Sequence, residues 1–193
     1  MDEPLDEPLD VLRAWLAAAT AAGVREPGVL ALATAGRDGR SESRMVQTLG
    51  VDAAGLIFCT HAGSVKGRHI AETGWASGVL YWRETGRQVC LAGPVTRLPD
   101  AVSDALWVAR PAGSHPMTVA SWQSEPLVDE EALRAAARRL GEAGAPLPRP
   151  GRFCGYRLEP STVEFWEAAP DRLHRRLRYD RSGATWASGR LQP

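Results

Sequence analysis

The chain has 193 residues, 44% of them hydrophobic, which is enough for one domain with a sizeable core and short for two. Its 23 basic and 23 acidic residues give a formal net charge of +0 at pH 7, and this balance argues against a nucleic-acid-binding protein, which normally has a basic excess. No apolar stretch reaches the length of a membrane span, and the three widely spaced cysteines favour free thiols in a reducing compartment. We therefore expect a cytoplasmic protein that binds neither nucleic acid nor membrane.

The chain is predicted to begin with an acidic tail and to continue with strands and helices in mixed order. Residues 1–10 lack the basic and apolar regions of a signal peptide and are expected to be disordered. In chain order, the predicted elements are a helix at 11–22, strands at 29–35, 41–49 and 56–60, a helix at 64–73, strands at 75–82 and 88–97, helices at 99–109 and 128–143, and strands at 152–159, 163–167, 173–179 and one ending near 191. Asp10 and Ser64 are the expected caps of the first two helices, and residues 110–125 are expected to form a loop.

The order of these elements predicts the fold class. Hairpins with helices inserted between them do not follow the strict strand–helix alternation of a doubly wound sheet. We therefore expect a mostly β domain, an antiparallel barrel with peripheral helices, that spans residues 11–193.

Several frequent catalytic motifs are absent from the sequence. It has no Gly-x-Gly-x-x-Gly segment after a strand, no Walker A loop and no Gly-x-Ser-x-Gly elbow. The four histidines are scattered and do not cluster with the cysteines, so no metal site is predicted. Arginine-rich strand ends and polar loops could hold a phosphorylated ligand, but many solvated surfaces share these features. Without family knowledge, the function stays open.

Several segments, in family order, resemble the pyridoxamine 5'-phosphate oxidase superfamily from Pro27 to the C-terminus. They are Ser43-Arg-Met-Val46, Thr60-His-Ala-Gly-Ser-Val-Lys66-Gly, Arg87-Gln-Val89, Arg110-Pro111, Gln123-Ser124, Val163-Glu-Phe-Trp166, Arg172-Leu-His174-Arg-Arg176 and Arg190-Leu-Gln-Pro193. A second set of segments is similar, more specifically, to the phenazine-biosynthesis FMN oxidases within that superfamily. Its segments are Thr60-His-Ala-Gly-Ser64, Trp75-Ala-Ser-Gly78, Leu80-Tyr-Trp-Arg-Glu-Thr85, Ser114-His-Pro-Met117 and Arg178-Tyr-Asp-Arg-Ser182.

The resemblance implies an FMN-binding split barrel that forms a homodimer, with FMN in two equivalent clefts between the subunits. The residues implied around the cofactor are Arg44, Met45, Val46, Gln47, Cys59, Thr60, Lys66, Gln88, Gln123, Ser124, Trp166 and Arg176. Arg44 and Lys66 would hold the FMN phosphate, because charged donors suit that group, and a cation such as Arg176 would favour flavin reduction. Since the flavin carries the chemistry, no catalytic side chain is assigned.

The residues implied on the substrate side include two positions where the chain departs from the vitamin B6 oxidases. The substrate-side set is Leu49, Arg110, Ser114, His115, Arg172 and His174. Pyridoxamine-type oxidases carry a phosphate-binding lysine where this chain has Leu49, and a tyrosine where it has Leu106. Losing them should weaken phosphate binding by roughly 1–3 kcal/mol for each charged hydrogen bond. The leucines instead suit a flat tricyclic substrate, an aromatic carboxylic acid.

Some of these residues have an ordinary alternative interpretation. Arg172, His174 and Arg176 alternate, so on a strand they would share one face, but a solvent-facing basic stripe would have the same spacing. Trp166 could equally be a core residue. These alternatives remain open at the level of the sequence.

The leading hypothesis is an FMN-dependent oxidase of phenazine biosynthesis. It would transfer hydride from a reduced phenazine carboxylic acid to FMN and then to O2, giving H2O2, with arginine and histidine side chains pairing with substrate carboxylates. One alternative is a pyridoxamine or pyridoxine 5'-phosphate oxidase. A second, from another class, is a non-catalytic flavin-binding protein, because related barrels bind cofactors without turnover.

Overall fold

A computed structural model of the chain describes residues 7–142, 144 and 146–193. The helices are α1 (Pro8–Ala21), α2 (Val65–Thr73), α3 (Asp100–Val108), α4 (His115–Ala120) and α5 (Glu130–Glu142), with short 3-10 turns at Arg83–Thr85 and Ala112–Ser114. The strands are β1 (Val29–Ala35), β2 (Ser41–Gln47), β3 (Gly50–Val51), β4 (Leu56–His61), β5 (Trp75–Trp82), β6 (Arg87–Arg97), β7 (Phe153–Leu158), β8 (Thr162–Glu167), β9 (Arg175–Ser182) and β10 (Thr185–Leu191). In the described part of the chain, no helix is both long and apolar enough to cross a membrane.

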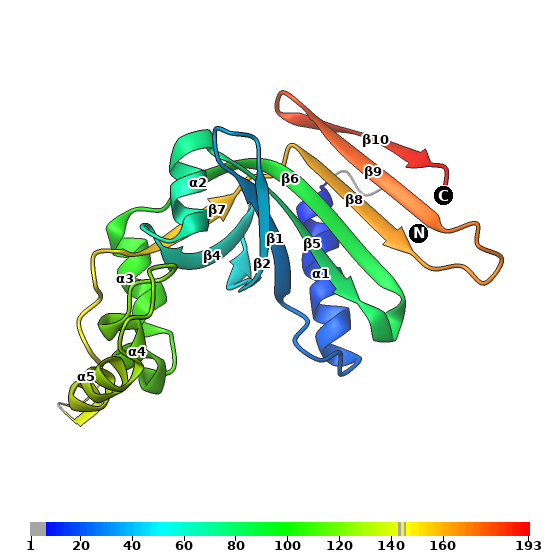
Figure 1. Ribbon diagram of the computed structural model, residues 1–193. Coiled ribbons are helices and arrows are strands. Elements are labelled where there is room, and N and C mark those ends of the chain that lie inside the picture. Colours follow the sequence, from blue (N-terminus) through cyan, green and yellow to red (C-terminus); the bar gives the residue numbers. More distant parts are fainter. Residues whose placement is uncertain (1–6, 143, 145) are drawn as a thin grey trace.

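The strands form one curled antiparallel sheet that splits into two arms (Figure 1). The main arm has the order β10-β9-β8-β6-β5-β1-β2, and the second arm pairs β3 with β4, β4 with β7, and β7 with the end of β6. Strand β6 joins the arms because its first half pairs with β8 and its last three residues pair with β7. Gly93 lies at this transition, where a Cβ would be 2.1 Å from the Glu159 carbonyl oxygen. The predicted split barrel with peripheral helices is confirmed.

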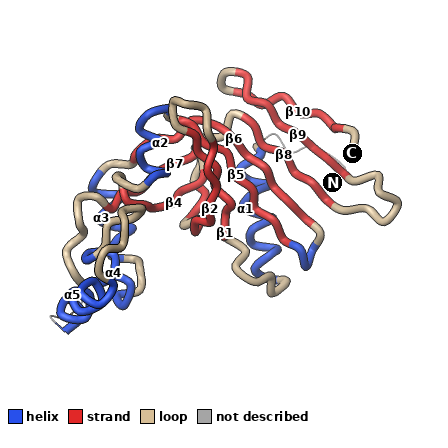
Figure 2. Tube along the Cα trace, in the orientation of Figure 1, coloured by secondary structure: helices blue, strands red, loops and turns tan. Residues whose placement is uncertain are grey.

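The core lies between α1 and one face of the main arm. Trp15 of α1 packs edge-on against Phe165 of β8, with ring centroids 5.2 Å apart. Alternating strand residues turn their apolar side chains inward, as a half-buried sheet requires. The fully or almost fully buried residues of this core, on α1 and on the strands, are Leu9, Leu12, Leu30, Leu32, Phe58, Leu80, Trp82, Val89, Leu91, Val163, Phe165 and Tyr179. Helices α3, α4 and α5 form a separate lobe beside the second arm (Figure 2).

The opposite face of the main arm remains uncovered in the single chain. One row of directly paired residues crosses five strands on this face: Tyr81, Gln88, Trp166, Arg176 and Leu191. Tyr81 is 58% exposed and Leu191 is 37% exposed. The row thus combines exposed apolar ends with the polar side chains of Gln88 and Arg176, a mixture that is typical of a protein–protein contact.

Several predicted boundaries are wrong. Helix α1 begins at Pro8, so 8–10 are helical, and the rest of the predicted tail, 1–6, lies outside the described residues. Asp10 is not the cap, because the N-cap position falls on Glu7, whose side chain makes no capping bond; Asp10 instead pairs with Arg13 within the first turn. The predicted loop at 110–125 contains α4, which Pro116 helps to start since proline is tolerated in a first helical turn.

The prediction for Ser64 is confirmed, and its cap supports both α2 and the loop before it. The buried Ser64 hydroxyl accepts from the Gly67 amide at 3.3 Å and donates to the His61 carbonyl at 2.7 Å. Replacing Ser64 with alanine removes both bonds, so we expect a loss of about 1–2 kcal/mol in the free energy of unfolding. Urea denaturation at one fixed protein concentration measures this loss.

Thr20→Ala is the matched control for this variant, because Thr20 is exposed near the end of α1. Its effect should stay within about 0.5 kcal/mol. Equal stability of the Ser64 variant and the parent protein would contradict the capping role.

Candidate functional site

A pocket of about 280 Å³ opens between β2, β4 and the helical lobe. Its lining is half polar and half apolar in character, which suits a ligand with both a flat ring and charged groups. The lining residues are Arg44, Met45, Val46, Gln47, Leu49, Cys59, Thr60, Lys66, Arg110, Thr118, Gln123 and Phe153. Ten of the residues predicted around cofactor or substrate, Arg110 among them, lie in this one pocket.

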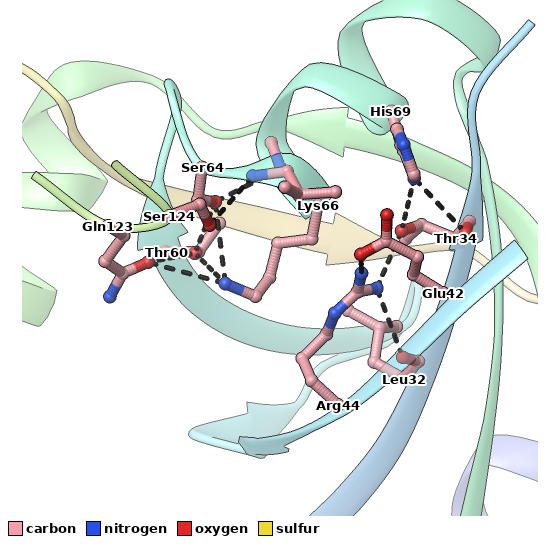
Figure 3. Close-up of polar contacts among 12 residues, drawn as sticks. Leu32, Thr34, Glu42, Arg44, Thr60, Ser64, Lys66, His69, Gln123 and Ser124 are labelled. Carbon is pink, nitrogen blue, oxygen red and sulfur yellow. Dashed lines mark hydrogen bonds and ion pairs between the residues drawn. The ribbon is translucent and has the colours of Figure 1, made fainter. Parts of the chain in front are cut away.

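Two cations extend into the pocket from different elements (Figure 3). The Lys66 ammonium, at the start of α2, donates to Thr60 Oγ1 at 3.1 Å and to Gln123 Oε1 at 3.4 Å. The Arg44 guanidinium of β2 donates to Thr34 Oγ1 at 2.7 Å and lies 3.6 Å from the exposed carboxylate of Glu42. Burial lowers the pKa of Lys66, and the positive charge of Arg44 lowers it further.

This pair of cations favours binding of an anion. Among the residues that the structure describes, Lys66 has no carboxylate within ion-pair distance and is surrounded by neutral acceptors. Like charges held close together at a partly buried site are stabilised when a negative group binds between them. Lys66 and Arg44 are therefore a suitable donor set for a phosphate.

The loop after α4 closes this end of the pocket. Gln123 accepts from Thr60 Oγ1 at 3.0 Å, and Ser124, at φ 70°, accepts from the Val65 amide at 3.2 Å. Arg152 holds the loop by donating to the Ser121 carbonyl at 3.0 Å and lying 4.1 Å above the Trp122 ring. No sequence pattern predicted this clamp.

His61 supports the same loop as a neutral ring. Its Nδ1 faces the Gln123 amide at 3.5 Å, and the residue is only 2% exposed. Burial, reinforced by the positive charges of Arg152 and Lys66, lowers the pKa of His61 to about 4. The imidazole therefore adds no further positive charge to the pocket at neutral pH.

Arg110 lies in a second part of the same pocket. Its Nη2 donates to Thr118 Oγ1 at 3.2 Å, and its guanidinium carbon lies 5.3 Å from the Trp107 ring centroid and 4.9 Å from that of Phe153. Its Nη1 is buried and has no partner in the described structure. Burial lowers the pKa of Arg110, an effect that the neighbouring Cys59 opposes. A buried donor without a partner is costly, so this atom is a candidate contact for an anionic ligand.

The pocket contains no obvious nucleophile or metal site. Burial raises the pKa of Cys59 to about 11, so its thiol is neutral and unreactive at ordinary pH. Within the described ranges, no three His, Cys, Asp or Glu residues are grouped so as to bind a metal ion.

A second group of predicted residues lies elsewhere, on the uncovered sheet face. Gln88, Trp166 and Arg176 are direct cross-strand neighbours on β6, β8 and β9. Arg176 pairs with Glu164 at 2.7 Å, and this hydrogen bond raises the pKa of Arg176. Four strand spacings separate β2 from β8 in the sheet order, which is about 19 Å along the sheet.

The alternation expected for Arg172, His174 and Arg176 on one strand is wrong. Strand β9 begins at Arg175, so Arg172 and His174 lie in the preceding loop. Arg172 is exposed and adopts a left-handed φ of 67°, which ends the regular alternation. His174 accepts from the Ala169 amide at 3.2 Å, and its ring lies 4.8 Å from the Trp166 ring.

Two further predicted substrate residues, Ser114 and His115, lie outside the pocket lining, whereas two unpredicted residues lie within it. The Ser114 hydroxyl donates to the Pro111 carbonyl at 2.7 Å, and the buried His115 ring stacks on Trp107 at 4.0 Å. Their contact with substrate remains a prediction. Thr118 and Phe153 line the pocket, but the first lies in the predicted loop and the second in an ordinary apolar strand, so no sequence signal marked them.

Comparison with known proteins identifies relatives along the whole chain. The family model for pyridoxamine 5'-phosphate oxidase matches residues 16–142, and a model for the pyridoxine 5'-phosphate oxidase C-terminal dimerisation region matches residues 153–193. A dihydrophenazinedicarboxylate synthase of Burkholderia lata is 55% identical over 100% of this chain and 91% of its own length. The enzyme of the same name from Pseudomonas chlororaphis is 49% identical, covering 99% of this chain and 86% of its own length.

A more distant relative and two solved structures are also similar to this chain. A pyridoxine/pyridoxamine 5'-phosphate oxidase of Rubrobacter xylanophilus is 40% identical over 97% of this chain and 87% of its own length. The crystal structure of PhzG from Burkholderia lata 383, in complex with tetrahydrophenazine-1-carboxylic acid, has a TM-score of 0.98 at 55% identity and covers 100% of this chain and 95% of that one. An FMN-binding protein of Nostoc punctiforme shares the fold, with a TM-score of 0.78 at 22% identity over 94% of this chain and 96% of that one.

Proposed function

This chain belongs to the pyridoxamine 5'-phosphate oxidase family, in its phenazine-biosynthesis branch, and we propose that it is an FMN-dependent oxidase of a reduced phenazine carboxylic acid. One observation carries the proposal: a single pocket combines a pair of cations, Lys66 and Arg44, at one end with a third cation, Arg110, in another part. A ligand pair with one phosphate and one carboxylate would match these charges.

The residues of the pocket fit FMN. Lys66 and Arg44 would bind the phosphate, and the loop of Gln123 and Ser124 would close over it. Met45 and Val46 of β2 would lie along the flavin ring. When bound, FMN would accept a hydride from the substrate and pass the two electrons to O2, giving H2O2.

The uncovered sheet face supports a homodimer. Gln88, Trp166 and Arg176 lie three, four and five strand spacings from the pocket strand β2, roughly 14 to 24 Å along the sheet, so they would reach a cofactor most simply in a second copy of the chain. The matched dimerisation region, residues 153–193, includes β8, β9 and β10, which carry part of this face. We infer that each FMN lies between two subunits and that the row from Tyr81 to Leu191 is buried there.

On the substrate side, Arg110 would bind a carboxylate and Leu49 would contact the flat ring. Leu49 lines the pocket and is 43% exposed, so an apolar ligand would cover it. Leu106, the other departure from the vitamin B6 oxidases, is not among the lining residues and packs beside Gly155. The argument against a phosphorylated substrate therefore rests on Leu49 in this structure.

The chain itself would bind, orient and desolvate the substrate. Aromatisation of the phenazine ring would favour the oxidation, so no strong acid or base is required, which agrees with a neutral Cys59 and a neutral His61. The three cysteines are free thiols, which suits a reducing compartment, and the cytoplasmic location stays a prediction.

An anaerobic titration tests the proposed function. We expect freshly generated hexahydrophenazine dicarboxylate to bleach the visible flavin absorbance of the FMN-loaded protein, and air to restore it. Pyridoxine 5'-phosphate should leave the flavin oxidised under the same conditions.

The other outcomes of the titration are equally informative. Bleaching by pyridoxine 5'-phosphate alone would assign the protein to vitamin B6 metabolism, as the names of the relatives at about 40% identity would suggest. A protein that does not bind FMN, or whose flavin neither compound reduces, would contradict the proposed oxidase.

A further inference from the structure

The orientation of Arg110 depends on a small number of contacts. The residue follows the end of α3, and its guanidinium lies against the rings of Trp107 and Phe153. Ring contacts of this kind restrict the plane of the guanidinium but leave it able to rotate within that plane. The hydrogen bond from Nη2 to Thr118 Oγ1, at 3.2 Å, is the contact that fixes the rotation.

The hydroxyl of Thr118 can act only as an acceptor for Arg110. Its proton is directed to the Ser114 carbonyl at 2.8 Å, four residues earlier in the chain. This back-bond is common for threonine in helices and holds the side chain in one rotamer. Arginine has no acceptor atom, so the remaining lone pair of the hydroxyl must receive the Arg110 donor. Thr118 is therefore not available as a donor to a ligand.

The backbone that carries Thr118 is also held in place. Arg152, at the start of β7, donates to the carbonyls of Val119 and Ser121 around the end of α4. The last turn of α4 is thereby tied to the sheet. The acceptor offered to Arg110 consequently has a fixed position relative to the pocket.

We propose that Thr118 is a positioning residue that holds Arg110 ready to bind the carboxylate of an aromatic substrate. This inference rests on the proposed function. With one Nη2 hydrogen bound to Thr118, we assign to the ligand the Nη1 of Arg110, which is buried and has no partner in the described structure. An arginine side chain loses rotamer entropy when it is fixed, and fixing it before the ligand binds removes part of that cost from binding. The hydroxyl thus acts on carboxylate affinity without touching the ligand.

The test compares two substitutions at this position in the FMN-loaded full-length protein. Thr118→Val keeps the branched shape and removes the hydroxyl, whereas Thr118→Ser keeps the hydroxyl. The probes are phenazine-1-carboxylic acid and unsubstituted phenazine, with binding followed by the change in flavin absorbance. We expect Thr118→Val to raise the Kd of the carboxylic acid about tenfold. The Kd values of phenazine and of FMN should stay within about twofold of those of the parent protein. Thr118→Ser should restore the affinity for the carboxylic acid.

The kinetic prediction separates positioning from general damage. Thr118→Val should raise KM for the reduced carboxylate while kcat changes little, since the reacting ring is held by other contacts. Unchanged binding of the carboxylic acid by Thr118→Val, or equal weakening of both phenazines, would overturn the proposal. If the parent protein binds FMN but neither phenazine, the proposed function itself fails and the inference fails with it.

Discussion

Replacing Lys66 with methionine is expected to raise the Kd of FMN by about two orders of magnitude. The substitution keeps most of the apolar stem and removes the ammonium, which is partly buried among Thr60, Gln123 and Ser64. A hydrogen bond to a charged group contributes about 1.5–3 kcal/mol, which corresponds to roughly 10- to 150-fold in affinity. Fluorescence titration of the apoprotein with FMN measures this loss directly.

Arg68→Met is the matched control for this variant, because it removes a cation from the same helix. The Arg68 side chain is exposed and donates to the Gly63 carbonyl at 2.5 Å, outside the pocket. Its FMN affinity should stay within about twofold of the parent protein. Equal affinity for FMN in the Lys66 and Arg68 variants would show that the phosphate binds elsewhere.

Arg44→Met combined with Lys66→Met provides a further measurement at the same end of the pocket. If both cations bind one phosphate, the loss of FMN-binding free energy in the double variant should differ from the sum of the losses in the two single variants, since residues that share a ligand group are energetically coupled. Additive losses would indicate two separate anions. The two cations are already coupled in the free protein, because the charge of Arg44 lowers the pKa of Lys66.

Local sequence chemistry predicted most of the secondary structure. The cap at Ser64, the stop at Gly23 and the glycine turns between strands act over a few residues, and each is found in the structure. The split of the sheet was not predictable in detail, because it depends on a contact between distant segments. Gly93 meets the backbone of Glu159 there, and no local pattern links those positions.

The sequence interpretation included most of the pocket-lining residues on the strands but fewer of those in the helical lobe. The segment around Thr118 contains Pro111, Gly113 and Pro116, which favour a loop reading, yet it forms α4. The family resemblance implied that both Arg110 and Ser114 lie on the substrate side. In the structure, the hydroxyl nearest to Arg110 belongs to Thr118, because one helical turn brings position 118 over position 114.

Arg110→Met is expected to lower kcat/KM for the reduced phenazine dicarboxylate by about two orders of magnitude, mainly through KM. The variant loses the buried Nη1 donor proposed for the carboxylate, and a charge-assisted hydrogen bond in a partly desolvated pocket accounts for a loss of this size. Steady-state oxygen consumption measures the change. Arg139→Met, on the exposed side of α5, is the control and should behave like the parent protein.

The same Arg110 variant should keep its FMN affinity and should be no less stable to urea. A buried cation with a donor that has no partner costs desolvation energy in the free protein, so its removal offsets the loss of the Thr118 hydrogen bond and the ring contacts. Binding sites commonly hold such groups at the expense of stability. A marked fall in the free energy of unfolding would instead mean that Arg110 serves the fold of the lobe, and the loss of turnover could then not be assigned to the carboxylate. Weak substrate binding at undiminished stability is the combination that identifies Arg110 as a ligand-binding residue.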